Sequence, residues 1–175
     1  VRVEIIDNDA LIDVVSSGFD AGVRFGERIA TDMIAIPLGP YQRSVVVATP
    51  EFLKQFKRPK HPKDLTEYPC IRHRFPSGAI YRWEFERGGI KLETEVDGPL
   101  TLGDVGMMLD AALSGIGLAY VFEAMAAQHI ASGALQTVLD DWCPHYAGLY
   151  LYYPSRRQMP SALRAFIEFL QATRK

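Results

Sequence analysis

The chain has 175 residues, of which 48% are hydrophobic and 23% are charged, and its formal net charge is −2. This composition is typical of a folded globular protein and excludes an intrinsically disordered chain. The small negative charge argues against a dedicated nucleic-acid-binding domain, which carries a basic excess. No apolar run approaches the roughly 20 residues that cross a bilayer, and no segment has the pattern of a signal peptide.

Apolar spacing and turn residues predict the secondary structure in chain order. The predicted strands lie at residues 1–7, 20–25, 33–38, 44–49, 70–74, 80–87, 90–96, 116–122, 134–139 and 146–155. The predicted helices lie at residues 10–17, in a short stretch opened by Thr49 and Pro50, at 105–114, at 122–132 and after Pro160. Gly88 and Gly89 separate two alternating runs, which indicates a β-hairpin. Residues 58–69 are polar and rich in proline, so we expect a loop with one helical turn.

Strands and helices alternate through most of the chain, and this order predicts an α/β fold with mainly parallel sheets. The hairpin interrupts that alternation in the middle of the chain, which favours two lobes over one continuous sheet. In open α/β sheets, ligands bind beyond the carboxyl ends of the strands. We therefore look for a site where the strands end.

Several common chemistries have no support in the sequence, so we expect no catalytic residue, no metal and no cofactor. The four histidines, His61, His73, His129 and His145, lack metal-ligand spacing. The nucleophile pattern GxSxG is absent, and Gly115-Ile116-Gly117 lies between a helix and a strand, the reverse of the order that phosphate binding needs. Cys70 and Cys143 are typical of two reduced, packed thiols in a cytoplasmic protein, and a redox pair is the alternative.

A few polar residues near strand ends are candidates for ligand binding, each with a plain structural alternative. Ser77, before Gly78, presents a hydroxyl to an anion or belongs to a simple turn. Arg72, in the basic run 72–74, holds a carboxylate or faces solvent. Thr101 lies beside the start of a helix whose free N–H groups can donate hydrogen bonds to a small anion, although Asp104 is foremost an N-cap. The aromatic residues of strand 80–87 are expected in the core.

The ordered set of motifs resembles the effector-binding domain of LysR-type transcriptional regulators, which has the type 2 periplasmic-binding-protein fold. The stretches that carry the resemblance are DNDALIDVVSSGFDAGVRFGE, MIAIPLGPYQRSVVVATPEFL, RPKHPKDLTEYPCI, RFPSGAIYRWEFERGG, VDGPLTLGDVGMMLDAALSGIGLAYVFE and LYLYYPSRRQMPSALRAFIEFL. Together they cover nearly the whole chain.

The resemblance implies one lobe formed by residues 1–45 and 149–175 and a second lobe formed by residues 46–148. The two crossovers, at 44–49 and 148–154, then serve as a hinge. A small organic anion or aromatic effector is expected in the cleft between the lobes. The residues expected to bind it are Phe25, Gly26, Arg72, Ser77, Thr101, Leu102 and Tyr120. Effector binding is expected to change DNA binding by a winged helix-turn-helix domain that this sequence does not contain.

The resemblance also implies a homodimer or higher homo-oligomer, in which residues 1–15 of one copy pack against residues 122–136 of another. Members of the family begin with a further strand and helix, so we expect those two elements to be missing from this sequence. The main alternative is a periplasmic solute-binding protein of the same fold, which predicts a secretion signal and a monomer. An enzyme of the same fold is the other alternative, and it requires a cleft acid or base with a shifted pKa.

Overall fold

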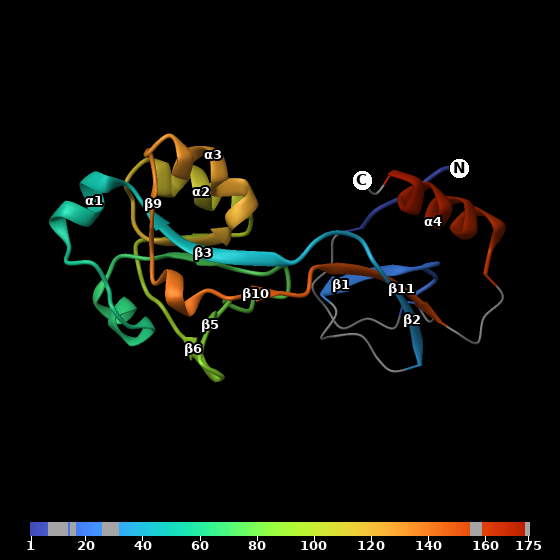
Figure 1. Cartoon of the computed structure of the whole chain (residues 1–175), viewed down its shortest axis with the longest axis horizontal. Helices are drawn as coiled ribbons and strands as arrows, with labels where there is room; N and C mark the ends of the chain where they lie inside the picture. The colour runs from blue at the N-terminus through green and yellow to red at the C-terminus, as the bar shows by residue number, and fades with distance from the viewer. Residues whose placement is uncertain (7–13, 15–16, 26–31, 155–158, 174–175) are drawn as a thin grey trace. The chain divides into compact units, whose positions relative to one another are not determined.

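The structure is a computed structural model that describes residues 1–6, 14, 17–25, 32–154 and 159–173. Its internal contacts divide the chain into two compact units. Unit 1 consists of Val1–Tyr41 and Tyr146–Lys175, and unit 2 consists of Gln42–His145. In Figure 1, unit 1 contains both the blue and the red ends of the colour scale, and unit 2 contains the colours between them. The chain therefore passes between the units twice.

Unit 1 is built on an antiparallel sheet with the strand order β1-β11-β2. These strands are β1 (Gly22–Phe25), β11 (Leu149–Pro154) and β2 (Met33–Pro37). Strand β11 lies in the centre, where its residue Leu151 is opposite Val23 of β1 on one side and Ile36 of β2 on the other. Helix α4 (Ser161–Thr173) covers the sheet and buries Leu163 and Ile167 against it. Residues from both ends of the chain thus form one core.

Unit 2 contains the remaining elements. They are β3 (Gln42–Ala48), α1 (Pro50–Gln55), η2 (Pro62–Glu67), β4 (Ile71–His73), β5 (Trp83–Arg87), β6 (Ile90–Thr94), β7 (Leu100–Leu102), α2 (Val105–Leu113), β8 (Ala119–Phe122), α3 (Glu123–Ala131), β9 (Gln136–Val138), η3 (Asp140–Trp142) and β10 (His145–Tyr146), whose last residue belongs to unit 1. The labels η2 and η3 denote short 3₁₀ helices. Strand β3 pairs with β8, β9 and β10, and it forms the centre of the unit.

Both faces of β3 are buried, because its residues alternate between two hydrophobic clusters. Val45 and Val47 pack in a cluster with residues of α2 and α3. Val46 and Ala48 pack in a second cluster with Trp83 and other residues of the β5–β6 hairpin and of α1. Figure 1 shows α2 and α3 on one side of β3 and the hairpin on the other. Burial on both faces explains why residues 45–48 form an unbroken apolar run in the sequence.

Local signals placed most elements correctly. Gly88 and Gly89 both have positive φ values, 58° and 79°, as a two-residue hairpin turn requires. The Thr49 hydroxyl accepts a hydrogen bond from the Phe52 N–H at 3.2 Å, and the Asp104 carboxylate accepts one from the Met107 N–H at 2.8 Å. The predicted N-caps of α1 and α2 are therefore confirmed.

Three expectations about the fold need comment. The described sheets are mostly antiparallel, so the prediction of mainly parallel sheets is wrong; only β4–β7 and one bridge, Cys70 to Leu118, are parallel. Strands β11 and β3 pair with strands that are distant in the sequence. The alternation of apolar residues within a strand does not determine whether it runs parallel or antiparallel to such a partner. Residues 1–6 form no strand, contrary to the prediction for 1–7. The predicted helix at 10–17 lies largely outside the described residues.

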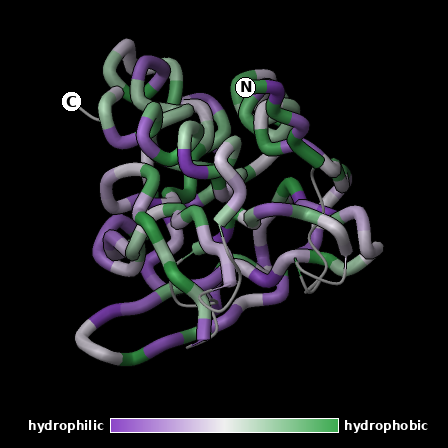
Figure 2. The backbone as a smooth tube through the Cα atoms, turned by 90° about the vertical axis from the view of Figure 1, so that its right-hand side faces the viewer, coloured by the Kyte–Doolittle hydropathy of each residue, from purple (hydrophilic) through white to green (hydrophobic). Residues whose placement is uncertain are grey.

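Among the described residues, none of the helices has the length and apolar content needed to cross a membrane. Figure 2 shows hydrophobic and hydrophilic residues alternating at short intervals along the tube.

Candidate functional site

Three neighbouring strands of unit 2 run in the same direction and bring several candidate residues together. Strand β4 pairs with β7 in a register that places Arg72 opposite Thr101. On its other side, the Ile71 N–H donates to the Leu118 carbonyl at 2.8 Å, just before β8. The order β7, β4, β8 therefore places Thr101, Arg72 and Tyr120 on adjacent strands near their carboxyl ends, where open α/β sheets bind ligands.

Two glycines allow these strands to approach closely. A Cβ atom on Gly98 would lie 2.0 Å from the Cys70 carbonyl oxygen, and one on Gly117 would lie 2.4 Å from the Pro69 carbonyl oxygen. Neither distance is possible for a real side chain, so both positions require glycine. These two glycines thereby position β4 between β7 and β8.

Arg72 is the charged residue of this group. Its Nε donates to the Thr101 hydroxyl at 3.1 Å, and its Nη1 forms an ion pair with Asp97 at 3.2 Å. The Arg72 side chain is 31% exposed and Asp97 is 86% exposed, so solvent weakens this ion pair. The Nη2 group has no hydrogen-bond partner among the described residues. The guanidinium is thus held in place by Thr101 and retains donors for an incoming anion.

Tyr120 joins this face of the sheet to an aromatic cluster on the hairpin. Its hydroxyl donates to the Glu84 carbonyl at 2.6 Å, and its ring stacks on Trp83 with centroids 5.5 Å apart. Tyr81 and Phe85 lie within 6.2 Å and 5.5 Å of the same ring. Trp83 is fully buried, as predicted for the core, and its indole N–H has no partner among the described residues. Tyr120 is therefore part of an aromatic cluster with Trp83, Tyr81 and Phe85.

Leu102 faces the other side of the sheet. Leu100 and Leu102 pack against the cluster formed with α2 and α3, whereas Thr101, one residue from each, faces the opposite way. The Leu102 carbonyl accepts a hydrogen bond from the Arg74 N–H at 2.8 Å. Leu102 thus supports the site through its backbone and does not present its side chain beside Arg72.

Ser77 occupies a tight turn just after β4. The Gly78 N–H donates to the Phe75 carbonyl at 2.8 Å, and the Arg74 side chain donates to the Gly78 carbonyl at 2.8 Å. Gly78 has a φ of 91°, which favours glycine at that position. Ser77 is exposed at the tip of this turn.

The other two candidate residues lie in or beside unit 1. Phe25 ends β1 opposite Leu149, and its ring meets the edge of Tyr146 with centroids 5.6 Å apart. Gly26 lies outside the described residues. Of the seven candidates, the structure thus brings Arg72, Thr101 and Tyr120 together on one face, with Leu102 behind them and Ser77 in the following turn.

The described residues contain no group of three or more His, Cys, Asp or Glu side chains that could hold a metal ion. Burial raises the pKa of Cys70 from 9.0 to about 12, with a smaller contribution from Asp97. Burial also raises the pKa of Cys143 to about 12, although the nearby Arg43 charge opposes the shift. Both are free thiols, and both therefore stay protonated at neutral pH.

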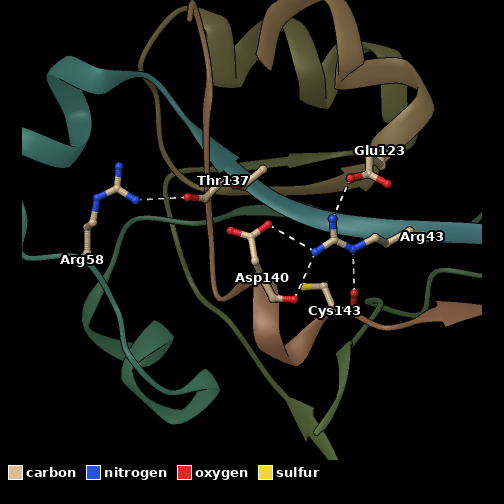
Figure 3. A network of polar contacts seen from close by, with 6 residues as sticks. All are labelled: Arg43, Arg58, Glu123, Thr137, Asp140 and Cys143. Atoms are coloured by element: carbon tan, nitrogen blue, oxygen red, sulfur yellow. Dashed lines mark hydrogen bonds and ion pairs between the residues drawn. The ribbon is translucent and has the colours of Figure 1, made fainter. Parts of the chain in front are cut away.

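Sequence reasoning missed one polar network, centred on Arg43 near the start of β3 (Figure 3). Arg43 donates to Glu123 on α3 at 2.6 Å and to the Cys143 carbonyl at 2.7 Å. It also donates to the carbonyl and the carboxylate of Asp140 at 3.0 and 3.2 Å. Burial alone lowers the pKa of Arg43, but the bond to Glu123 and the two acidic charges outweigh it and raise the pKa. The partners are 80 to 100 residues away in the chain, so no local pattern signals this network.

Comparison with known proteins identifies the family. The model of the LysR substrate binding domain matches residues 1–175, the whole chain. The chain therefore belongs to the LysR substrate-binding-domain family, as its motifs predicted.

The relatives are regulators of transcription. A Pseudomonas aeruginosa protein named as a transcriptional regulator is 42% identical over 99% of this chain and 57% of its own length. The Escherichia coli HTH-type transcriptional regulator YcaN is 37% identical over 98% of this chain and 56% of its own. The chain thus spans little more than half the length of these relatives. The family is not enzymatic, in agreement with the prediction that this chain is not an enzyme.

A solved structure supports the fold independently. The full-length Vibrio cholerae virulence activator AphB superposes with a TM-score of 0.75 at 21% identity, over 94% of this chain and 56% of that one. The mixed α/β fold is therefore that of LysR-type regulatory domains.

Proposed function

We propose that this chain is the effector-sensing part of a transcriptional regulator and that a small organic effector binds to it and changes DNA binding by the whole protein. The observation that carries the proposal is the family match over residues 1–175. The relatives with helix-turn-helix names extend well beyond the region that this chain covers, so the DNA-binding part is proposed to lie in the rest of such a protein. Such a regulator acts in the cytoplasm, where its DNA is.

The effector site that we propose consists of Phe25 and Gly26 from one lobe and five residues from the other. Those residues are Arg72, Thr101, Leu102 and Tyr120 on β4, β7 and β8, and Ser77 in the turn after β4. The lobes correspond to residues 1–45 with 149–175 and to 46–148, and the crossovers act as a hinge. An effector that binds one lobe arrangement more tightly shifts the population toward it.

The contacts of Arg72 suggest what kind of effector fits. A guanidinium that is already oriented by Thr101 binds a planar carboxylate well, because two parallel hydrogen bonds form at little entropic cost. Asp97, largely exposed, is easily displaced from Arg72 by such an anion. The Tyr120 ring adds an aromatic surface beside it. We therefore propose a small carboxylate, aromatic or aliphatic, as the effector.

The experiment is a calorimetric titration of the chain with benzoate, phenylacetate and succinate as probes. We expect binding by at least one probe, and about tenfold or greater weakening in Arg72→Gln, since a charge-assisted hydrogen bond contributes about 1.5–3 kcal/mol. Thr101→Val and Ser77→Ala should weaken binding less. Arg164→Gln, an exposed arginine on α4, is the matched control. If a probe binds and none of the three variants weakens it, the proposed site is wrong.

We also propose that the chain forms homodimers through residues 122–136 of one copy and residues 1–15 of the other. The exposed residues of α3 carry no formal charge; they are Ala124, Met125, Ala127, Gln128 and Ala131. Four apolar residues near the N-terminus are also exposed, namely Val1, Val3, Ile5 and Ile6. The uncharged face of α3 and the exposed apolar side chains of the N-terminal stretch, which also carries Arg2 and Glu4, are suited to association.

Sedimentation velocity tests the dimer directly. Met125→Glu should shift the protein toward the monomer, because it places a charge in the centre of the proposed contact. Ile90→Glu, at the start of β6, changes another exposed apolar residue elsewhere and should leave the sedimentation unchanged. A wild-type monomer at high micromolar concentration contradicts the proposal.

A further inference from the structure

Residues 54–63, which we call the basic segment, carry a strong local charge. The segment contains Lys54, Lys57, Arg58, Lys60 and Lys63 and no acidic residue, in a chain whose formal net charge is −2. All five side chains are exposed. None of the four lysines forms an ion pair with a described residue. The segment therefore carries a local excess of positive charge on a protein whose formal net charge is negative.

The backbone of the basic segment is anchored at several points. The Lys60 and His61 N–H groups donate to the Asp64 carboxylate at 2.9 and 3.0 Å, so this nearby acid is engaged by the main chain. The Tyr68 hydroxyl donates to the Lys57 carbonyl. These contacts hold the main chain in place at Lys57, Lys60 and His61.

Arg58 differs from the lysines, because it is bound within the unit. Its Nη1 donates to the Thr137 carbonyl at 3.2 Å (Figure 3), and its Nη2 donates to the Gln136 side chain. These bonds connect the segment to β9. Arg58 thus contributes charge and anchoring, while the lysines keep their three N–H donors for a partner.

The apolar residues around the basic segment are turned inward. Phe52, Leu53 and Leu65 are buried, and the half-buried Phe56 ring stacks on Phe52 with centroids 4.7 Å apart. Pro59 and Pro62 are buried as well. Interfaces with proteins are depleted in lysine and rely on exposed aromatic or aliphatic anchors. The basic segment has lysines and lacks such anchors, which favours a polyanion over a folded protein as its partner.

We propose that the basic segment binds the phosphate backbone of duplex DNA without reading its sequence. Lysine is a flexible point charge that neutralises phosphates and displaces their counterions, whereas sequence reading requires side chains placed against base edges. The chain belongs to a family whose relatives regulate transcription, so it works beside DNA. The basic segment would hold flanking DNA against the regulatory domain. The inference rests on family membership and is independent of the effector site.

Fluorescence anisotropy of the chain with a labelled 20-base-pair duplex of random sequence tests the proposal. Binding should be measurable at low salt and should weaken about 100-fold between 50 and 200 mM salt if the four lysines each neutralise one phosphate. The variant K54Q/K57Q/K60Q/K63Q should lose at least tenfold in affinity at low salt. The slope of its plot of log affinity against log salt concentration should be smaller in magnitude by about 3 to 4 than the slope of the wild type.

The matched control removes the same charge elsewhere. R2Q/R82Q/K91Q/R164Q changes four exposed cations outside the segment and produces the same net charge. It should keep the wild-type salt slope. Equal losses in the two variants, or no binding by the wild type at 20 mM salt, overturn the proposal. Lysine-dependent binding to poly-glutamate as tight as to DNA also overturns it, in favour of an acidic protein partner.

Discussion

Arg43 and Glu123 form a hydrogen-bonded ion pair of 2.6 Å that joins the start of β3 to the start of α3. Arg43 lies one residue after unit 2 begins at Gln42. Cys143, whose carbonyl Arg43 also binds, lies two residues before the unit ends at His145. One side chain thus ties together both ends of unit 2. The side chain of Arg43 is only 16% exposed, so its bonds to Glu123 and to the Cys143 carbonyl are partly shielded from solvent, whereas its bonds to Asp140 are exposed.

Replacing Arg43 by methionine should destabilise unit 2 by about 1–3 kcal/mol, because the Cys143 and Asp140 carbonyls lose their donor. Urea denaturation followed by circular dichroism measures the free energy of unfolding. Arg82→Met is the control, since Arg82 is 58% exposed and its ion pairs with Glu93 and Glu95 lie at the surface. We expect no measurable loss there, and equal stability of the two variants contradicts the role given to Arg43.

Gly98→Ala should be strongly destabilising. The new methyl group would lie 2.0 Å from the Cys70 carbonyl oxygen and 2.5 Å from its nitrogen, and both are backbone atoms that hold β4 in place. We expect a loss of about 3 kcal/mol or more in thermal or urea unfolding. Gly39→Ala has open space around its Cβ position and should cost far less. Similar losses of stability in Gly98→Ala and Gly39→Ala would contradict the close approach of the backbone at Gly98 to Cys70.

The two thiols should not react in the folded protein. Cys70 and Cys143 are 0% and 3% exposed, and burial raises the pKa of each to about 12. In Ellman's assay at pH 8, we expect reaction only after denaturation, when both thiols become accessible. Fast reaction of either thiol in the native state contradicts this expectation and revives the redox-pair alternative.

The raised pKa values of the same two thiols should make the free energy of unfolding depend on pH. Because their folded pKa values are raised, their contribution to stability is complete below about 9 and is lost as pH rises toward about 12. Urea unfolding at a series of pH values between 8 and 12 measures this loss. In the C70A/C143A variant the loss over that interval should be smaller, whatever the stability of the variant at pH 8. An unchanged pH dependence rules out the thiols as its source.

Asp104→Ala should destabilise unit 2 by about 1 kcal/mol, because the Met107 N–H at the start of α2 loses its acceptor. Asp110→Ala, on the same helix, removes an exposed carboxylate that makes no cap and should be neutral. Thermal unfolding of the two variants compares them at equal charge. A loss at Asp110 as large as at Asp104 contradicts the capping role.

Local chemistry determined most of the elements. Paired glycines at 88–89 sufficed for the hairpin, and Thr49 and Asp104 sufficed for two helix starts, because turns and caps depend on residues within a few positions. The short 3₁₀ helix η3 and the strand β7 were not predicted. Both are three residues long, and so short a segment shows no measurable period.

The candidate site was only partly accessible to sequence reasoning. Arg72, Thr101 and Leu102 could be singled out as polar or strand-end residues, but their pairing depends on β4 meeting β7, 29 residues later. A shift of one residue along a strand reverses the face, and the register alone turns Thr101 toward Arg72 and Leu102 toward α2. No local sequence pattern pointed to Arg43, because its partners lie 80 to 100 residues away, in α3 and in and just after η3.

The sequence by itself determined the family, the mixture of helices and strands and the positions of turns and caps, because these follow from residue order and short-range spacing. The tertiary structure decided the direction of the strands, the close approach at Gly98 and Gly117, and the network around Arg43. Those features arise when segments far apart in the chain pack together. The energy of such contacts depends on shape and burial in three dimensions, which no local stretch of sequence specifies.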